Sequence, residues 1–480
     1  MPKRPCRFPT RGQAGSLSLI IAALLTFALK VQGQASLSDS TFAIEPGTVG
    51  LVSAILVQAD GKILVGGSFT QIAGQTHPYL ARLESNGQLD TSFPAETDGS
   101  VFRLLAQPDG KILVGGSFNN LQGVARKGIG RLLTNGTVDL DFDAGLLPGS
   151  EQSAFALGLQ PAGKILYVNL APNGELFRLN SDGQLDSSFV QTNVFQGFHA
   201  FAICPRTNGS ILVGGGFGAV NGFATPGLAL LDTDGRLDTN YNSQLKTNST
   251  TTAILEQPDG SLLIGGGMWR QGSTNRISLA RLTSILEWDS SFHADSIDPN
   301  LSAYGYGYIF SMLLLPDDKI LVGGNFQEVG GYWRRSIVRL DSAGRVDPCF
   351  DSALGLASSY SLASSYSFGV IALARQSDGK ILAGGDFVDL ISDKPNTTNI
   401  VRLLSESDCN NNRVYLRPLV DGNFTATATF SPGGTNSLQI STNLVDWVDS
   451  VSNTRPYLYL DMPSPAASGS QIYFRGKKQY

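Results

Sequence analysis

The chain is built from one recurring sequence unit. The phrase DGKILVGGSF at residues 60–69 returns with small changes at 109–118, 208–217, 259–268, 317–326 and 378–387, and a degenerate copy lies at 162–166. A second phrase, with the ending L-D-T-S-F, spans residues 82–93, and its relatives end at Phe142, Phe189, Tyr241, Phe292 and Phe350. Spacing within each phrase is constant, whereas the whole repeat varies around a mean period of 53 residues. This pattern predicts rigid β units that are joined by adjustable loops.

Each repeat predicts four short strands. In the second copy, residues 101–106 are apolar, residues 108–110 form a hairpin turn, and residues 112–118 make the next strand. The paired glycines suit a place where backbones approach closely. A third strand ends at Arg-Leu, and an Asn-Gly or Asp-Gly turn leads to a fourth, L-D-x-S-F. Four-stranded sheets repeated around an axis make a β-propeller, and a solenoid of stacked repeats is the alternative.

The two ends of the repeat region favour the propeller. The seventh repeat ends at residues 402–404 without the L-D-x-S-F phrase, and the missing phrase stands at residues 37–42. We therefore expect an all-β fold, with a seven-bladed β-propeller closed by an N-terminal strand and followed by a small β-sandwich. In the third repeat Val168 and Asn169 replace the glycine pair, which predicts an irregular second strand there.

Composition excludes several classes of protein. Hydrophobic residues make up 42% of the chain and the net charge is only −5, which argues against disorder. Without net positive charge the chain is not expected to bind nucleic acid. Only three histidines are present, so a histidine-based metal or acid–base centre is not expected.

The N-terminus has the pattern of a secretory signal peptide. Basic residues precede an apolar run of 13 residues at 17–29, and small residues follow at Gly33 and Ala35. The run is shorter than the roughly 20 residues of a membrane span, so no transmembrane anchor is expected. We predict a signal peptide at 1–35, a propeller at 36–408 and a small β module at 409–480, in a protein that is secreted, periplasmic or on the cell surface. Cys204, Cys349 and Cys409 then remain, an odd number that does not form a disulfide framework.

Two resemblances rest on these motifs. The phrases P-D-G-K-I-L-V-G-G-S-F and L-D-x-S-F resemble the delta-60 repeats of secreted bacterial proteins, which form β-propellers. In the tail, the phrase S-L-Q-I-S-T-N-L at 437–444 leads to Trp447 and resembles C-terminal modules of exported proteins from Verrucomicrobia-like bacteria. Neither resemblance implies catalytic residues or a cofactor.

A propeller of this kind has one face of constant short turns and one face of variable loops. Function concentrates on loops that a rigid scaffold holds, so we expect the site on the variable face, where blades five to seven carry the aromatic and arginine residues. The candidate ligand-binding residues are Trp269, Arg270, Tyr304, Tyr306, Tyr308, Tyr332, Trp333, Arg334, Arg335, Tyr360 and Tyr366. Such groups suit a glycan or a protein ligand. The alternative is that these aromatic residues pack beneath their own long loops.

Other kinds of site have weaker signals. Residues 180–186 and 232–238 faintly resemble calcium loops but lack the glutamate that ends such a loop, so calcium is the one cofactor left open, and calorimetric titration tests it. No nucleophile motif, phosphate loop or Cys/His metal spacing is present in the sequence. We expect a monomeric, non-enzymatic binding propeller without assigned catalytic residues. The alternative is a polysaccharide-acting hydrolase or lyase that uses carboxylates of the loop face.

Alanine substitutions test the predicted binding face. We expect Trp333→Ala and Tyr306→Ala to abolish binding on a glycan or protein-partner array without lowering thermal stability, because exposed aromatic residues contribute to binding more than to folding. Loss of stability with unchanged binding would show that these side chains support their own loops.

Overall fold

The computed structural model describes residues 39, 41–42, 44, 47–145, 153–169, 174–190, 194–294, 297, 307–330, 332–347, 350, 354–356, 369–389 and 398–404, and six strands between 413 and 479. The chain divides into two compact units, one spanning Leu37–Cys409 and the other containing Asn410–Tyr480. Almost all regular structure is β, and the one helix among the described residues is the 3-10 turn η1 (Pro161–Gly163). No described helix has the length and hydropathy to cross a membrane.

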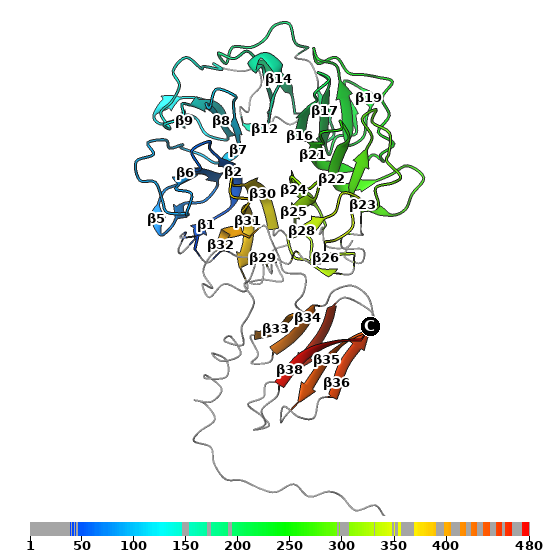
Figure 1. Cartoon of the computed structure of the whole chain (residues 1–480). Coiled ribbons are helices and arrows are strands. Elements are labelled where there is room, and N and C mark those ends of the chain that lie inside the picture. The colour runs from blue at the N-terminus through cyan, green and yellow to red at the C-terminus, as the bar shows by residue number, and fades with distance from the viewer. Residues whose placement is uncertain are drawn as a thin grey trace, which may run out of the picture. The chain divides into compact units, whose positions relative to one another are not determined.

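The first unit is a ring of seven antiparallel blades (Figure 1). In blade one the inner strand β2 (Val52–Val57), the middle strand β3 (Ile63–Gly67) and the outer strand β6 (Leu80–Leu83) pair in that order. Blades two to seven are, in the same order within each blade, β7 (Val101–Ala106), β8 (Ile112–Gly116) and β11 (Ile129–Leu132); β12 (Ala154–Leu159), β13 (Ile165–Asn169) and β14 (Leu176–Leu179); β16 (Ala200–Pro205), β17 (Ile211–Gly215) and β20 (Leu228–Leu231); β21 (Thr250–Glu256), β22 (Leu262–Trp269) and β23 (Arg276–Leu282); β24 (Ile309–Leu314), β25 (Ile320–Gly324) and β28 (Ile337–Leu340); and β30 (Gly369–Arg375), β31 (Ile381–Asp389) and β32 (Thr398–Leu403). Each inner strand contacts the next, and β30 contacts β2.

The structure does not form the fourth strand that the sequence predicted for each repeat. Its phrase forms only a single β-bridge to the outer strand, as between Leu83 and Leu89, and the chain then turns away. The turn follows from Asp90, whose Oδ1 accepts hydrogen bonds from the backbone N (3.0 Å) and Oγ (2.5 Å) of Ser92. A side chain that caps its own turn competes with continued strand pairing. Equivalent bridges are Leu132 to Val138, Leu179 to Leu185, Leu231 to Leu237, Leu282 to Trp288 and Leu340 to Val346.

The glycine pair marks two close approaches, as the sequence predicted. A Cβ on Gly66 would lie 2.6 Å from Cγ1 of Val101 on the next blade, and a Cβ on Gly67 would overlap the carbonyl oxygen of Leu51. The pair therefore lets one blade pack against the next and also accommodates a bulge in its own inner strand. In blade seven a Cβ on Gly384 would lie 2.5 Å from Cγ1 of Val52 in blade one, so the last and first blades meet in the same way.

Blade three keeps a regular middle strand without the glycine pair. β13 pairs with both β12 and β14, so the expected irregularity is wrong. Val168 and Ala200 share one buried cluster, and Ala200 stands where blades one and two carry Val52 and Val101. The small side chain of Ala200 on blade four leaves room for the larger Val168 on blade three.

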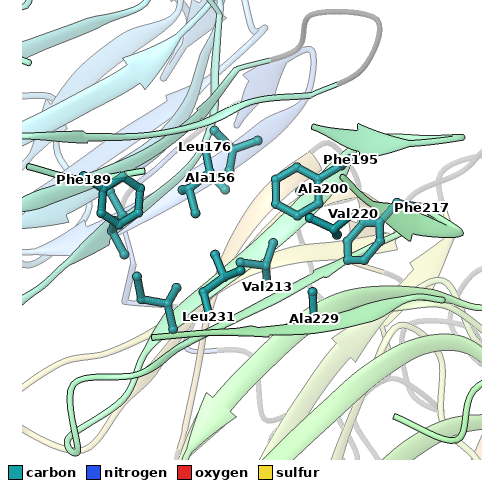
Figure 2. Packing of buried hydrophobic residues seen from close by; sticks show 13 residues of the cluster. Ala156, Leu176, Phe189, Phe195, Ala200, Val213, Phe217, Val220, Ala229 and Leu231 are labelled. Carbon is teal, nitrogen blue, oxygen red and sulfur yellow. The ribbon is translucent and has the colours of Figure 1, made fainter. Parts of the chain in front are cut away.

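The blades are joined by buried apolar clusters that each span two neighbours. The cluster between blades three and four contains Phe189, Phe195, Val213 and Phe217, and Figure 2 shows it from close by. Six further clusters have the same plan. The core is thus distributed around the ring, which explains why the repeats are apolar on both faces of each sheet. Cys204 is a buried free thiol in one of these clusters, and Cys349 and Cys409 lie outside the described residues.

A buried ion pair recurs at the outer edge of the blades. In blade one Arg82 Nε lies 2.8 Å from Asp90 Oδ2, with side chains only 7% and 5% exposed, and the guanidinium lies 4.5 Å from the ring centroid of Phe93. Arg82 Nη1 also donates to the carbonyl oxygen of Thr134 in blade two (3.4 Å). The Arg–Asp pairs of the other blades are Arg131–Asp139, Arg178–Asp186, Arg281–Asp289, Arg339–Asp347 and Arg402–Asp39. We call this set, with the phenylalanine of each, the arginine clamps.

Blade four lacks the clamp arginine, because Leu230 stands at its position. Blade four still contacts the next blade, since Arg206 Nη2 donates to the carbonyl oxygen of Ser284 at 2.7 Å. Arg206 occupies the repeat position where blade one has Gln58. Gln58 likewise donates to the next blade, at the carbonyl oxygen of Thr134, so blade four keeps the bond from this position and lacks only the one from the outer strand.

The N-terminal segment supplies the clamp aspartate of blade seven. The backbone N of Asp39 donates to the carbonyl oxygen of Arg402 (2.7 Å), and Asp39 Oδ2 lies 2.9 Å from Arg402 Nη2. The Arg402 guanidinium also lies 4.8 Å from the ring centroid of Phe42. These are the contacts that closure of the ring by the N-terminal segment requires.

The second unit contains two antiparallel three-stranded sheets. One has the order β33 (Arg413–Pro418), β34 (Phe424–Thr429) and β37 (Tyr457–Met462), and the other β36 (Val448–Asn453), β35 (Thr435–Ser441) and β38 (Tyr473–Gln479). Strands of the two sheets contact one another. Two small sheets in contact are compatible with the expected sandwich, and Trp447 lies outside the described residues.

Removing one clamp carboxylate tests the ring closure. We expect Asp39→Asn to lower the free energy of unfolding at pH 7 by about 3 kcal/mol, because the buried Arg402 guanidinium loses its partner. Asp238→Asn is the matched control: blade four has no clamp arginine, so its expected loss is within about 0.5 kcal/mol. Urea unfolding measures both variants, and equal losses would contradict the role of the pair.

The difference between wild type and Asp39→Asn also depends on pH. Burial alone would raise the pKa of Asp39, but hydrogen bonds from Thr41 and Lys380 and the charge of Arg402 outweigh it and lower the pKa from 3.8 to about 2. A carboxylate with a lowered pKa stabilises the folded chain fully above its unfolded pKa. The stability difference should therefore be complete above about pH 4 and disappear as the pH falls to about 2.

Candidate binding face

The two faces of the ring are built differently. On one face every described inner-to-middle turn and every turn after an outer strand is closed by local hydrogen bonds, such as Gln58 N to the carbonyl of Lys62 and Glu84 N to the carbonyl of Gln88, both 2.8 Å. Side chains join neighbouring turns, as where Gln58 Nε2 donates to the carbonyl of Thr134. We call this face the turn face, and its hydrogen-bonding groups are used in holding the ring together.

The opposite face, here the variable face, carries structure that differs from blade to blade. Small hairpins join middle to outer strands in blades one, two, four and six. Two of them pair with a strand of the chain entering the blade, and the other two each form a single β-bridge to it. The strands are β1 (Thr48–Val49), β4 (Gln71–Ile72) and β5 (Gln75–Thr76); β9 (Asn120–Leu121) and β10 (Val124–Ala125); β15 (Phe195–Gln196), β18 (Ala219–Val220) and β19 (Phe223–Ala224); and β26 (Glu328–Val329) and β27 (Tyr332–Trp333). In blades five and seven the middle strands β22 and β31 are longer, and β31 pairs with β29 (Leu354–Leu356).

Two predicted site residues come together through a third that the sequence did not single out. The Arg276 guanidinium, on β23 of blade five, lies 4.7 Å from the ring centroid of Tyr308, which enters blade six, and 5.9 Å from that of Trp269 on β22. Gly267 makes this approach feasible, since a Cβ there would lie 2.7 Å from Tyr308 Cε1 and 2.8 Å from Arg276 Nη2. All three side chains are half-buried. We call Trp269, Arg276 and Tyr308 the blade-five cluster.

Arg270 lies beside this cluster but belongs to a different contact. Its guanidinium lies 4.9 Å from the ring centroid of Trp288, and its Nη2 donates to Oε1 of Gln244 at 2.9 Å. Arg270 itself is exposed, and Trp288 Nε1 donates to the carbonyl oxygen of Ser243 at 3.1 Å. Blade five thus presents two guanidinium groups, each held over an aromatic ring.

The other predicted site residues have different positions. Tyr304, Tyr306, Tyr360 and Tyr366 lie outside the described residues. Tyr332 and Trp333 form β27, which pairs with β26. Arg334 is only 3% exposed and its backbone N donates to the carbonyl of Gln327, whereas Arg335 is half-buried.

Sequence reasoning missed two exposed aromatic residues on blade four. Phe198 and Phe223 are each 54% exposed, in the chain entering the blade and on β19. No length or composition signal marks them, because the loop that contains each has ordinary length. The signal that could have found them is their place in the repeat, since both lie between phrases and not within one.

The carboxylates with clearly shifted pKa values serve structural contacts. Burial would raise the pKa of Asp98 on the variable face, but hydrogen bonds from the backbone N of Asn120 (2.9 Å), its side chain (2.7 Å) and the backbone N of Asn119 (2.7 Å) lower it. In the loop at 232–238, Arg236 lies within ion-pair distance of both Asp232 and Asp234. No group of three or more His, Cys, Asp or Glu side chains among the described residues could hold a metal ion.

Seven segments of the chain match one family, whose description reads "Domain of unknown function (DUF5122) beta-propeller". They are residues 58–93, 107–142, 162–189, 206–241, 257–292, 315–350 and 376–408, which together make up half of the chain. The chain belongs to the DUF5122 β-propeller family. Each match begins at an inner-to-middle turn and, in the first six repeats, ends at the clamp phenylalanine or at Tyr241. No curated protein matches the sequence.

Solved structures similar to this DUF5122 chain are distant in sequence. A structure titled streptogramin B lyase is 14% identical, with 77% of this chain and 96% of that one covered and a TM-score of 0.44. The extracellular domain of a putative hybrid two component system from B. thetaiotaomicron is 12% identical, with 93% and 54% covered and a TM-score of 0.45. The Dos1 propeller is 12% identical, with 82% and 95% covered and a TM-score of 0.39.

A double-mutant cycle tests the geometry of the blade-five cluster. Because the Arg276 guanidinium faces the Tyr308 ring, we expect Arg276→Met and Tyr308→Leu to couple by about 0.5–1 kcal/mol in urea unfolding. The control cycle pairs Tyr308→Leu with Arg345→Met, an exposed arginine of the turn face, and its coupling should be near zero. Equal coupling in both cycles would contradict the contact.

Proposed function

We propose that this chain is an exported, non-enzymatic binding propeller that recognises a glycan or protein partner through the variable face of blades five to seven. The observation that carries the proposal is the Arg276 guanidinium held between the rings of Trp269 and Tyr308, which come from two different blades. The position of Arg276 supports the proposal that the binding site lies on the variable face, and it adds Arg276 to the residues that the sequence singled out.

The chemistry of the blade-five cluster suits recognition. Aromatic rings bury much area with few rotatable bonds, and a guanidinium donates several hydrogen bonds in a fixed plane. Stacking fixes the guanidinium in position before a ligand arrives, so less conformational entropy is lost on binding. Exposed Arg270, which stacks on Trp288 and bonds to Gln244, extends the same chemistry along blade five.

The contrast between the faces supports the same conclusion. On the turn face the clamp arginines are engaged with aspartates and with carbonyl oxygens of the next blade. On the variable face the hairpins differ between blades and carry side chains that the ring does not need for its closure.

The remaining parts of the proposal follow the sequence motifs. Residues 1–35 act as the signal peptide, residues 36–408 form a propeller of the delta-60 type, and residues 409–480 form an accessory module of the kind found in exported proteins of Verrucomicrobia-like bacteria. The protein is secreted, periplasmic or on the cell surface, and it acts as a monomer.

A binding screen with matched variants tests the proposed function. The purified mature protein is applied to glycan, cell-wall and protein arrays, and hits are measured by calorimetry. We expect the Trp269→Ala/Tyr308→Ala double variant to weaken binding at least about tenfold, since aromatic residues dominate binding energy. Ile285→Ala, which removes a 73% exposed side chain on the turn face, should leave it unchanged. Equal affinity of the double variant and wild type would refute the site.

A further inference from the structure

The inner strands of all seven blades share a bulge near the variable face. In each blade the pairing register skips one residue close to the start of the inner strand. The skipped residues are Ser53, Phe102, Phe155, Phe201, Thr252, Phe310 and Ile371. Because the inner strands surround the centre of the ring (Figure 1), these residues form a circle around the axis. Three of its aromatic members lie on the adjacent blades two, three and four, and the fourth, Phe310, lies on blade six.

One blade departs from the repeat directly after this bulge. The next residue is alanine or serine in six blades, at Ala54, Ala156, Ala202, Ala253, Ser311 and Ala372, but it is Arg103 in blade two. A small residue fits here because the position faces the inner strand of the following blade. The ring does not require an arginine at this position, since six blades pack without one.

Arg103 brings a positive charge to the inner strand of blade two. Its guanidinium lies 5.4 Å from the ring centroid of Phe155, and its Nη1 donates to the carbonyl oxygen of Phe102 at 2.9 Å. Among the described residues no carboxylate lies within ion-pair distance of it. Burial lowers the pKa of Arg103 to about 10, so the group stays protonated at neutral pH while it has lost part of its hydration. A half-buried guanidinium that faces an aromatic ring and has no carboxylate nearby among the described residues favours an anionic partner.

Aromatic rings connect Arg103 to the surface. The ring centroids of Phe102 and Phe155 are 5.8 Å apart, those of Phe155 and Phe201 5.5 Å, and those of Phe201 and Phe198 5.8 Å. Phe198, the last of the row, is 54% exposed. The row therefore runs from a cation near the axis to an exposed ring on the variable face, all within blades two to four.

We propose that this row is a second binding site, for a small organic carboxylate with an apolar body, whose carboxylate pairs with Arg103 while its body lies along Phe155 and Phe201. Arginine and a carboxylate match geometrically, because two parallel N–H groups reach two oxygens. The proposal does not depend on the blade-five cluster, which lies on other blades.

The test uses 4-fluorophenylacetate as probe and its uncharged amide as the matched control ligand. Binding to the purified chain is followed by fluorine NMR and calorimetry. We expect saturable binding of the carboxylate and at least about tenfold weaker binding of the amide, because the amide cannot form the charged pair. Absence of saturable carboxylate binding at millimolar concentration, or equal binding of the amide, would overturn the proposal.

Variants separate this site from the proposed function. Arg103→Ala introduces the residue that most other blades carry, so it should fold with an unchanged or raised melting temperature and lose carboxylate binding at least about tenfold. Phe198→Ala should weaken binding less, and Trp269→Ala/Tyr308→Ala should leave it unchanged. Carboxylate binding that survives Arg103→Ala would refute the site, whatever the outcome of the glycan and protein screen.

Discussion

The arginine clamp is the interaction on which the ring depends. One guanidinium contacts an aspartate and a phenylalanine of its own blade and, in the blades where the bond is described, a carbonyl oxygen of the next blade. Each clamp therefore holds a blade together and fixes its neighbour with the same group. A buried ion pair is costly when a partner is missing, and here hydrogen bonds and a ring face satisfy the remaining donors. Repetition of this contact produces regular geometry even where the apolar residues vary.

Blade four shows what the ring requires from the clamp. With Leu230 in place of arginine, the contact to Ser284 comes from Arg206 on the inner strand side. In blade one both positions make this bond, because Gln58 and Arg82 each donate to the carbonyl oxygen of Thr134. Blade four therefore keeps one of the two bonds to its neighbour and lacks the ion pair within the blade. The pKa of Tyr241, which replaces the clamp phenylalanine there, is raised by burial despite the opposing charge of Arg206.

The sequence predicted the architecture closely because the repeat encodes it several times. The phrase spacing identified the blades, and residues 37–42 identified the segment that meets Arg402. The prediction of a fourth strand was wrong because Asp90 and its equivalents cap their own turns and end strand pairing after one bridge. A pattern of strand propensities does not show that a side chain will compete with the partner strand for backbone hydrogen bonds. Arg276 and Arg103 were missed because each acts across a blade boundary, where sequence distance says nothing about proximity. Residues such as Tyr306 and Tyr366 remain predictions.

The pairing of Asp39 with Arg402 joins residues 363 positions apart. Contacts of such separation form late, since a long loop must close before they can stabilise anything. The last blade therefore cannot be completed until the whole repeat region has been synthesised and folded. Until then the outer edge of β32 lacks its partner segment, and the side of blade one that packs against blade seven is exposed. Folding of this chain should accordingly end with a single closing event, and any truncation within the repeats would leave an exposed strand edge of the kind that promotes aggregation.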